Sequence, residues 1–165
     1  MLARLVSLSI NDGMDVYEML QRIGPCENKF KNTAHGLTRE EFRAWLRQQF
    51  DWSEGRNLPE GFVAQSVYWF YDGEVPVGIG KIRHELTENS KNIGGNIGYA
   101  IDPRYRGKGY GSVFVKQLVA KAKELGVNDI LFTIEKYNPA SRRVVEKSGG
   151  RLIRENEERW FYSFE

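Results

Sequence analysis

The stretch Gly94–Ser112 decides the fold, and its sequence is GGNIGYAIDPRYRGKGYGS. Large apolar residues from Ile97 to Ile101 alternate with small ones, which is the period of a strand with two different faces. Asp102 and Pro103 predict the end of this strand, because proline lacks a backbone N–H and restricts the residue before it. Three glycines and two cations follow in Arg106–Gly111, at the start of a helix. Glycines at a helix N-terminus let backbone N–H groups approach a ligand, so this stretch predicts a pyrophosphate site.

The composition of residues 1–165 predicts one globular domain. Hydrophobic residues make up 41% and aromatic residues 13% of the chain, which suffices for a packed core and argues against disorder. The net charge is only +2, from 24 basic and 22 acidic residues, so the overall electrostatic field of the protein does not favour the binding of nucleic acid. Cys26 is the only cysteine and the two histidines lie far apart, so we expect no metal site. No run approaches the ~18 apolar residues of a membrane span, and we expect a cytoplasmic protein without a membrane partner.

Hydrophobic periodicity and turn signals predict the remaining elements. Thr38 and Glu41 resemble a capping box at the start of a helix, and Gly73–Pro76 predicts the turn of a β-hairpin. Asn138 before Pro139 predicts another helix start, because asparagine caps a helix and proline suits its first turn. In order, we expect a strand at 3–10, a helix at 14–23, a polar loop at 25–36, a helix from 38 to 50, strands at 62–72, 77–86 and 97–101, a helix at 113–125, a strand at 129–135, a helix at 138–149 and two β-runs within 151–165.

The order of these elements predicts an α+β fold. The strands between residues 62 and 101 follow one another through short turns, which favours an antiparallel meander. The passage strand–helix–strand from residue 97 to residue 135 places its two strands parallel. We therefore expect a mixed sheet, antiparallel in its first half and parallel at its centre, flanked by helices on both faces.

Two motifs in this passage resemble a known superfamily. Arg106-x-x-Gly-x-Gly, after an Ile-Asp-Pro turn, matches the (Gln/Arg)-x-x-Gly-x-(Gly/Ala) signature of the GNAT superfamily, the acetyl-CoA-dependent N-acyltransferases. Asn138-Pro-Ala-Ser, followed by residues 146–149, resembles the second coenzyme-side element of that superfamily, one helix and one strand further along. The resemblance is specific over residues 94–150. It implies a GNAT-like sheet whose two central strands splay apart around the pantetheine arm of the cofactor.

The resemblance also implies that acetyl-CoA is the co-substrate, and it assigns the contacts. The backbone of the glycine loop would hold the pyrophosphate with Arg106 in support, and the strand before it would pair with the pantetheine. Lys108 is either an extra cation for the phosphates or a solvated side chain, and Asn138 is also a helix cap. The expected cofactor-binding residues are Tyr99, Ala100, Ile101, Arg106, Gly107, Lys108, Gly109, Tyr110, Gly111, Ser112, Asn138 and Ser141.

The catalytic positions depart from the superfamily pattern. Many members carry a tyrosine seven residues after the asparagine as the acid for the departing thiolate, and that position is Val145 here. Other members use a glutamate at the position of Thr133 or on the earlier strand near Gly95, and neither is present. Glu135 is the nearest carboxylate, so we expect it to act as base or to position a water, although a surface role is the alternative. His84 is a second candidate base. The simpler interpretation is that its side chain is hydrogen-bonded within the protein or exposed to solvent.

These observations predict an N-acetyltransferase that moves an acetyl group from acetyl-CoA directly to a primary amine. The alternative is a non-catalytic acyl-CoA-binding sensor, which the missing tyrosine and glutamate favour. A site poor in bases suits an amine of low pKa, since about 14% of an α-amine but only about 0.04% of a lysine-type amine is neutral at pH 7. A nucleic-acid partner is not expected at this near-neutral charge. The sequence leaves the identity of the acceptor and the formation of a homodimer open.

Overall fold

The computed structural model describes all residues from Met1 to Glu165. Most predicted elements are present, with shifted ends. The predicted loop at 25–36 also contains a small hairpin, in which Asn28 and Lys29 turn with positive φ values of 50° and 67°. The elements are β1 (Ala3–Ser7), α1 (Met14–Ile23), β2 (Cys26–Glu27), β3 (Phe30–Lys31), α2 (Arg39–Ser53), β4 (Gln65–Asp72), β5 (Val75–Arg83), β6 (Ile97–Ile101), a 3₁₀ turn (Pro103–Tyr105), α3 (Tyr110–Glu124), β7 (Ile130–Glu135), α4 (Pro139–Lys147), β8 (Arg151–Glu155) and β9 (Arg159–Phe164).

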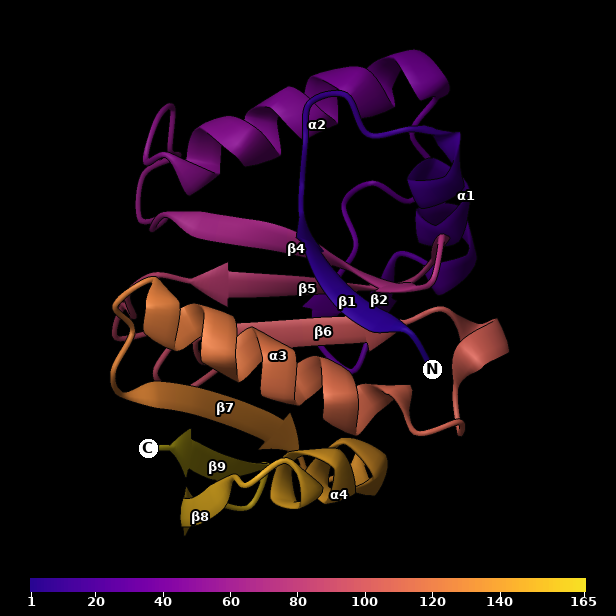
Figure 1. Cartoon of the computed structure of the whole chain (residues 1–165). Coiled ribbons are helices and arrows are strands. Elements are labelled where there is room, and N and C mark those ends of the chain that lie inside the picture. Colours follow the sequence, from indigo (N-terminus) through magenta and orange to yellow (C-terminus); the bar gives the residue numbers. More distant parts are fainter.

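Apart from the small β2–β3 hairpin, the strands form two antiparallel ladders that meet between β6 and β7. The first has the order β1-β4-β5-β6 and the second the order β7-β9-β8. β6 and β7 point the same way and lie next to each other (Figure 1). They are joined at one end only, where Asn96 N donates to Leu131 O at 2.8 Å and Leu131 N donates to Asn96 Oδ1 at 2.9 Å. Beyond this junction the strands separate, so the predicted mixed sheet with a central splay is confirmed.

Gly95 lies at the closed end of the splay and permits the close approach of the two ladders. Its φ is +60°, and a Cβ atom there would lie 2.3 Å from the backbone oxygen of Leu131. A residue with a side chain would therefore meet backbone rather than a movable side chain. The glycine fixes how closely β6 and β7 meet at this point.

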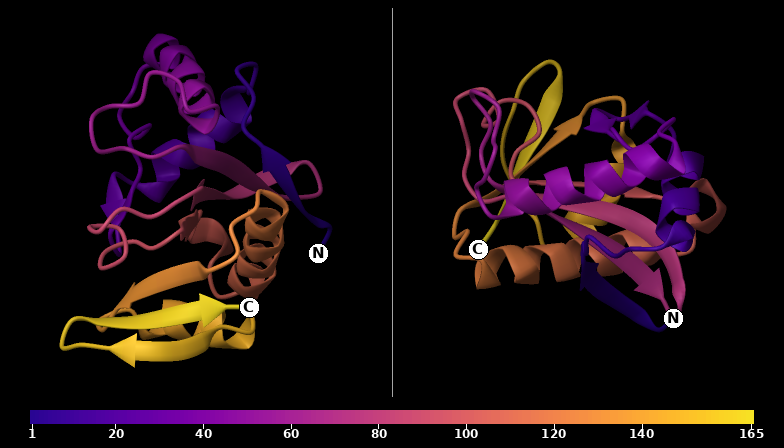
Figure 2. Two further views of the ribbon diagram at one scale, coloured as in Figure 1. Left: turned by 90° about the vertical axis from the view of Figure 1, so that its left-hand side faces the viewer. Right: turned by 90° about the horizontal axis from the view of Figure 1, so that it is seen from above.

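Helices cover both faces of the first sheet, as expected, and each pair of helices closes a separate core. Val67 and Trp69 of β4 pack against α1 and α2, while Tyr68 and Phe70 belong to the core under α3 and α4. The two layers of helices lie on opposite sides of the strands in Figure 2. Gly80 of β5 lets α3 lie close to the sheet, because a Cβ atom there would be 2.7 Å from Leu118.

Two predicted helix caps are present in the structure. At the start of α2, Glu41 N donates to Thr38 Oγ1 at 3.2 Å and Thr38 N donates to Glu41 Oε2 at 2.7 Å, which completes the capping box. At the start of α4, Ser141 N donates to Asn138 Oδ1 at 3.2 Å. None of the helices has the length and apolar character that crossing a membrane requires.

Candidate active site

The loop before α3 presents backbone N–H groups that the protein does not use. Gly107 and Gly109 have φ values of +73° and +86°, and a Cβ atom on either would meet nothing within 4 Å. Gly109 is the N-cap of α3 and supplies no side-chain cap, so the helix begins at Tyr110, three residues earlier than predicted. No backbone hydrogen bond outside the regular elements is donated by residues 107–112, and first-turn amides have no intrahelical acceptor. The open space in front of free amides fits a bound anion.

Gly111, the third glycine of the loop, has a different role from the other two. A Cβ atom on Gly111 would lie 3.1 Å from Cγ2 of Val144. The absence of a side chain at this position therefore allows α3 and α4 to pack closely. The sequence attributes all three glycines to the phosphate cradle, whereas the structure gives this one a packing function as well.

Arg106 ties the loop to two other segments of the chain. Its Nε donates to Ile101 O at 2.9 Å, and its two terminal nitrogens contact the carboxylate of Glu27 at 2.8 and 2.5 Å. The guanidinium thus links the end of β6 and the loop to β2, which lies 79 residues earlier. These hydrogen bonds hold the shape of the loop. Lys108 has no such tie, and its ammonium lies 5.3 Å from the ring centre of Tyr105.

Asp102 anchors the turn that leads from β6 into the loop. Its side chain is fully buried, and it accepts hydrogen bonds from Arg22 Nε at 2.8 Å and from the backbone N of Arg104 at 3.0 Å. Burial alone raises the pKa of this carboxyl, but the hydrogen bonds from Arg22 and Arg104 outweigh burial and hold the pKa below its usual value. An ionised Asp102 therefore fixes the direction in which the chain leaves β6.

The free edge of β6 directs alternate backbone groups into the splay. Arg83 N donates to Asn96 O at 2.7 Å and Asp102 N donates to Val77 O at 2.9 Å, so even-numbered residues of β6 face β5. The backbone groups of Tyr99 and the other odd-numbered residues consequently face the gap toward β7. Of the three residues expected to pair with pantetheine, Tyr99 and Ile101 have this orientation. Ala100 has the opposite one.

Tyr99 and Ser141 connect β6 to α4 across the α3/α4 face of the splay. The Tyr99 hydroxyl lies 3.2 Å from Ser141 Oγ, and the ring packs edge-on against Phe114 with centroids 6.1 Å apart. Burial raises the pKa of Tyr99. Asn138 caps α4 through its oxygen, and its amide nitrogen makes no hydrogen bond within the protein. The structure therefore brings the Tyr99, Asn138 and Ser141 side chains together beside the gap.

The candidate catalytic positions are all engaged with the protein itself. Glu135 accepts from Arg159 Nε at 3.0 Å, and their side chains are 7% and 10% exposed. Thr133 Oγ1 accepts from Gly94 N at 2.7 Å. Val145 is fully buried in the core under α3 and α4, so it supplies no proton. Glu135 lies four residues beyond the closed end of the splay, or about 13 Å along β7.

His84 is satisfied by a neighbouring strand. Its Nε2 lies 2.7 Å from Ser66 Oγ on β4. Burial lowers the pKa of His84 despite the nearby carboxylates of Glu54 and Glu85. The simpler of the two interpretations of this residue, a satisfied histidine, agrees with the hydrogen bond.

Two residues of β5, Lys81 and Arg83, lie beside the splay and were missed in the sequence. Strand alternation places them on the α1/α2 face together with the buried Ile79. The sequence pattern that could have pointed to them is the presence of two cations on a strand face that is otherwise apolar.

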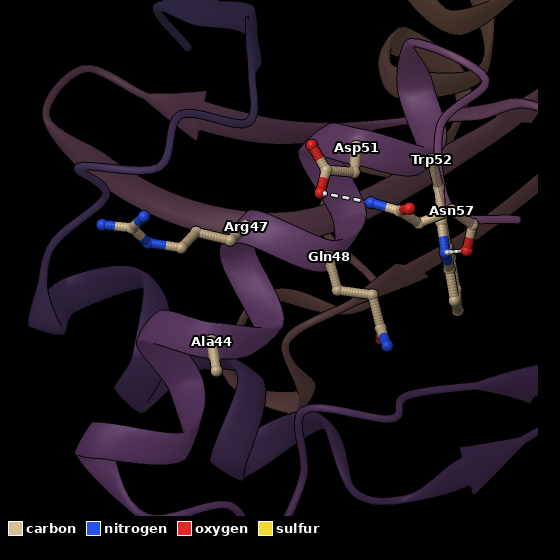
Figure 3. A pocket seen from close by; sticks show the side chains of 6 residues that line it. All are labelled: Ala44, Arg47, Gln48, Asp51, Trp52 and Asn57. Carbon is tan, nitrogen blue, oxygen red and sulfur yellow. Dashed lines mark hydrogen bonds between the residues drawn. The ribbon is translucent and has the colours of Figure 1, made fainter.

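A shallow pocket on α2 lies apart from all of these groups. Figure 3 shows its lining residues, which come from α2 and the following loop: Ala44, Arg47, Gln48, Asp51, Trp52 and Asn57. Asn57 satisfies its polar neighbours by donating to Asp51 Oδ2 at 3.3 Å and accepting from Trp52 Nε1 at 3.2 Å. α2, whose residues line this pocket, lies at the opposite end of the molecule from β7 and α4 (Figure 1). No group of three or more metal-ligating side chains occurs there or elsewhere.

Comparison with known proteins identifies the class to which this site belongs. The family model of the acetyltransferase (GNAT) domain matches residues 4–151. The chain therefore belongs to the GNAT family, and it is an acetyltransferase.

Solved structures with the same fold include three acetyltransferases at low sequence identity. The Campylobacter jejuni N-acetyltransferase PseH, in complex with acetyl coenzyme A, is 14% identical, covers 99% of this chain and 98% of its own, and has a TM-score of 0.65. RimL, a ribosomal L7/L12 alpha-N-protein acetyltransferase in complex with coenzyme A, is 13% identical over 99% and 94% of the two chains, with a TM-score of 0.72. The ribosomal-protein-S5-alanine acetyltransferase of Vibrio fischeri is 17% identical over 99% and 93%, with a TM-score of 0.73. No curated protein sequence matches this chain.

Proposed function

We propose that residues 1–165 form one acetyltransferase domain that transfers the acetyl group of acetyl-CoA directly to a primary amine. The observation that carries the proposal is the set of unused amides at residues 107–112, placed next to the free edge of β6. The amides suit the pyrophosphate, and the splay suits the pantetheine arm. Tyr99 and Ile101 would pair with that arm through backbone groups, and Asn138 through its free amide nitrogen.

The protein contributes mainly positioning and backbone electrostatics. The thioester supplies the driving force, and its thiol, with a pKa of roughly 8.5, leaves largely as the thiolate without a strong acid. A backbone N–H of β6 that faces the gap stabilises the developing oxyanion. Holding both substrates in one geometry accounts for much of the remaining acceleration. A mechanism that needs no strong side-chain acid agrees with a site in which the usual tyrosine is replaced by the buried Val145.

The experiment for this function is thiol release from acetyl-CoA against a panel of primary amines, with cofactor binding measured in parallel. The panel covers amino acids, peptides, polyamines and aminoglycosides, and compares an α-amine with an ε-amine of matched size. Turnover is expected, with the α-amine faster. Binding without turnover of any amine would favour an acyl-CoA sensor. Failure to bind acetyl-CoA would refute the proposal.

Glu135 is proposed to position the water that takes the amine proton. Its side chain lies on the same face of β7 as Thr133, at the wide end of the splay, and uses only one oxygen for Arg159. Glu135→Gln keeps the size of the side chain and is expected to lower kcat about tenfold to a hundredfold, with little change in the affinity for CoA. Steady-state kinetics and calorimetry measure the two quantities.

The matched control is Arg159→Gln, which breaks the same ion pair and keeps the carboxylate. Both variants are expected to lose stability, because removing one partner of a buried pair leaves the other uncompensated. Only Glu135→Gln should lower the kcat of the folded enzyme. Equal kcat values in the two variants would show that Glu135 is a structural residue.

A further inference from the structure

If the protein has the proposed function, the amine acceptor must enter the splay, and only one face of the splay is open to it. On the α3/α4 face the gap is covered by the Tyr99–Ser141 contact and by buried side chains of both central strands, such as Ile97 and Phe132. The opposite face carries the segment between α1 and α2, including β2 and β3. Residues that line this second face therefore determine which amine is accepted.

Lys81 lies on this face next to the central strand. It pairs with Gly98 of β6 in the antiparallel ladder, and its Nζ donates to the backbone oxygen of Lys31 at 2.8 Å. The ammonium lies 4.9 Å from the ring centre of Phe30, and the same ring would lie 3.3 Å from a Cβ atom on Gly98. Lys81 is thus held against the β2–β3 hairpin on the face of the sheet opposite α3 and α4, with β6 as the one strand between it and the gap.

Arg83 places a second cation at the closed end of the splay. Its Nη1 donates to Gly95 O at 2.8 Å, and a Cβ atom on Gly94 would lie 2.8 Å from the same nitrogen. Gly94 N in turn donates to Thr133 of β7. The guanidinium therefore lies against the segment that joins the two halves of the sheet, on the same face as Lys81.

Neither cation has a carboxylate partner. The ion pairs of the structure include Arg22, Arg106 and Arg159 but not Lys81 or Arg83, whose only hydrogen-bond acceptors are backbone oxygens. Burial and the neighbouring Arg83 lower the pKa of Lys81 to about 8, and burial lowers the pKa of Arg83. Two cations partly withdrawn from water, without a counter-ion, are unfavourable unless an anion joins them.

We propose that Lys81 and Arg83 bind an oxyanion carried by the acceptor, so that the substrate class is anionic primary amines. A carboxylate or a phosphate ester next to the amine provides the missing counter-charge, and arginine suits both through its forked N–H groups. The same two cations repel polyamines, aminoglycosides and lysine-rich peptides. An anionic group bound near the closed end of the splay also holds the amine close to the backbone of β6.

The test compares amines that differ only in charge. Glutamate is paired with glutamine, phosphoserine with serine, and an aspartyl peptide with its asparaginyl counterpart, each with its α-carboxyl group amidated, so that the side-chain anion is the only difference and carboxylates and phosphates are separate arms. The unmodified enzyme is expected to show a kcat/KM at least about tenfold higher for the anionic member of one arm. Lys81→Met and Arg83→Met should each remove most of that preference, mainly through KM. Lys116→Met, which changes an exposed lysine on α3, is the matched control and should keep it.

Each outcome decides between specific alternatives. Turnover limited to neutral or cationic amines would overturn this inference and leave the proposed function in place. A uniform loss of kcat in Lys81→Met for all amines would also overturn it, and would make Lys81 a base instead. If no amine is turned over, the proposed function fails, and NMR of lysine-labelled protein with CoA decides the inference. Saturable shifts of the Lys81 signal by glutarate or inorganic phosphate, absent in Arg83→Met, would support it, and non-saturable shifts would refute it.

Discussion

Replacing Gly109 by alanine is expected to weaken the binding of acetyl-CoA at least about tenfold, which corresponds to about 1.4 kcal/mol of binding free energy. Gly109 caps α3 in the left-handed conformation, with φ +86° and ψ 0°. A methyl group there would occupy open space next to the unused amides of the loop, because nothing in the protein lies within 4 Å of it. The pyrophosphate would then be kept from the amides on which the site depends.

Gly126 provides the matched control at the other end of the same helix. Its φ is also +86°, and a Cβ atom there would likewise meet nothing within 4 Å. Gly126→Ala should therefore lose the same 1–2 kcal/mol or so of stability from left-handed strain, without any effect on the cofactor. Calorimetric titration with CoA and thermal unfolding separate the two effects. Equal CoA affinities in the two variants would show that the loop is not the pyrophosphate site.

The loop, the helix caps and the order of elements were predictable because each depends on residues close together in the sequence. Asn138 caps α4 through an amide only three residues away. The alternation within residues 97–101 and the proline after Asp102 define the strand and its end without reference to distant residues. The start of α3 was misplaced by three residues, because the left-handed Gly109 already serves as the N-cap and helical hydrogen bonding begins with Tyr110.

The contacts that shape the site could not be predicted, because they join residues far apart in the chain. Arg106 binds Glu27 across 79 residues, and nothing in the sequence indicates this contact, by which the arginine holds the loop. Glu135 meets Arg159 because β7 and β9 pair in one particular register. A shift of that register by one residue would place Arg159 on the other face, so the ion pair depends on the whole second sheet.

Gly95→Ala is expected to cause a larger loss of stability, about 3–5 kcal/mol, and to abolish the defined splay. The added methyl group would lie 2.3 Å from Leu131 O, so β6 and β7 must move apart at their junction. This movement breaks the two hydrogen bonds between Asn96 and Leu131, and Asn96 is only 2% exposed. Buried polar groups left unpaired cost about 1–3 kcal/mol each, and left-handed strain adds about 1–2 kcal/mol.

Gly55→Ala is the control that separates the clash with Leu131 from the strain of an alanine in the left-handed conformation. Gly55 follows α2 with a φ of +73°, and a Cβ atom there meets nothing within 4 Å, so this variant should lose only the strain. Urea unfolding at constant m-value measures both free energies, and titration with CoA tests whether the surviving Gly95→Ala protein still binds its co-substrate. Because the junction sets the separation of β6 from β7 along the whole gap, we expect weak binding even where the protein remains folded. Equal stability losses in the two variants would mean that the two halves of the sheet can shift at Asn96 without cost, and that the splay is adjustable rather than fixed by Gly95.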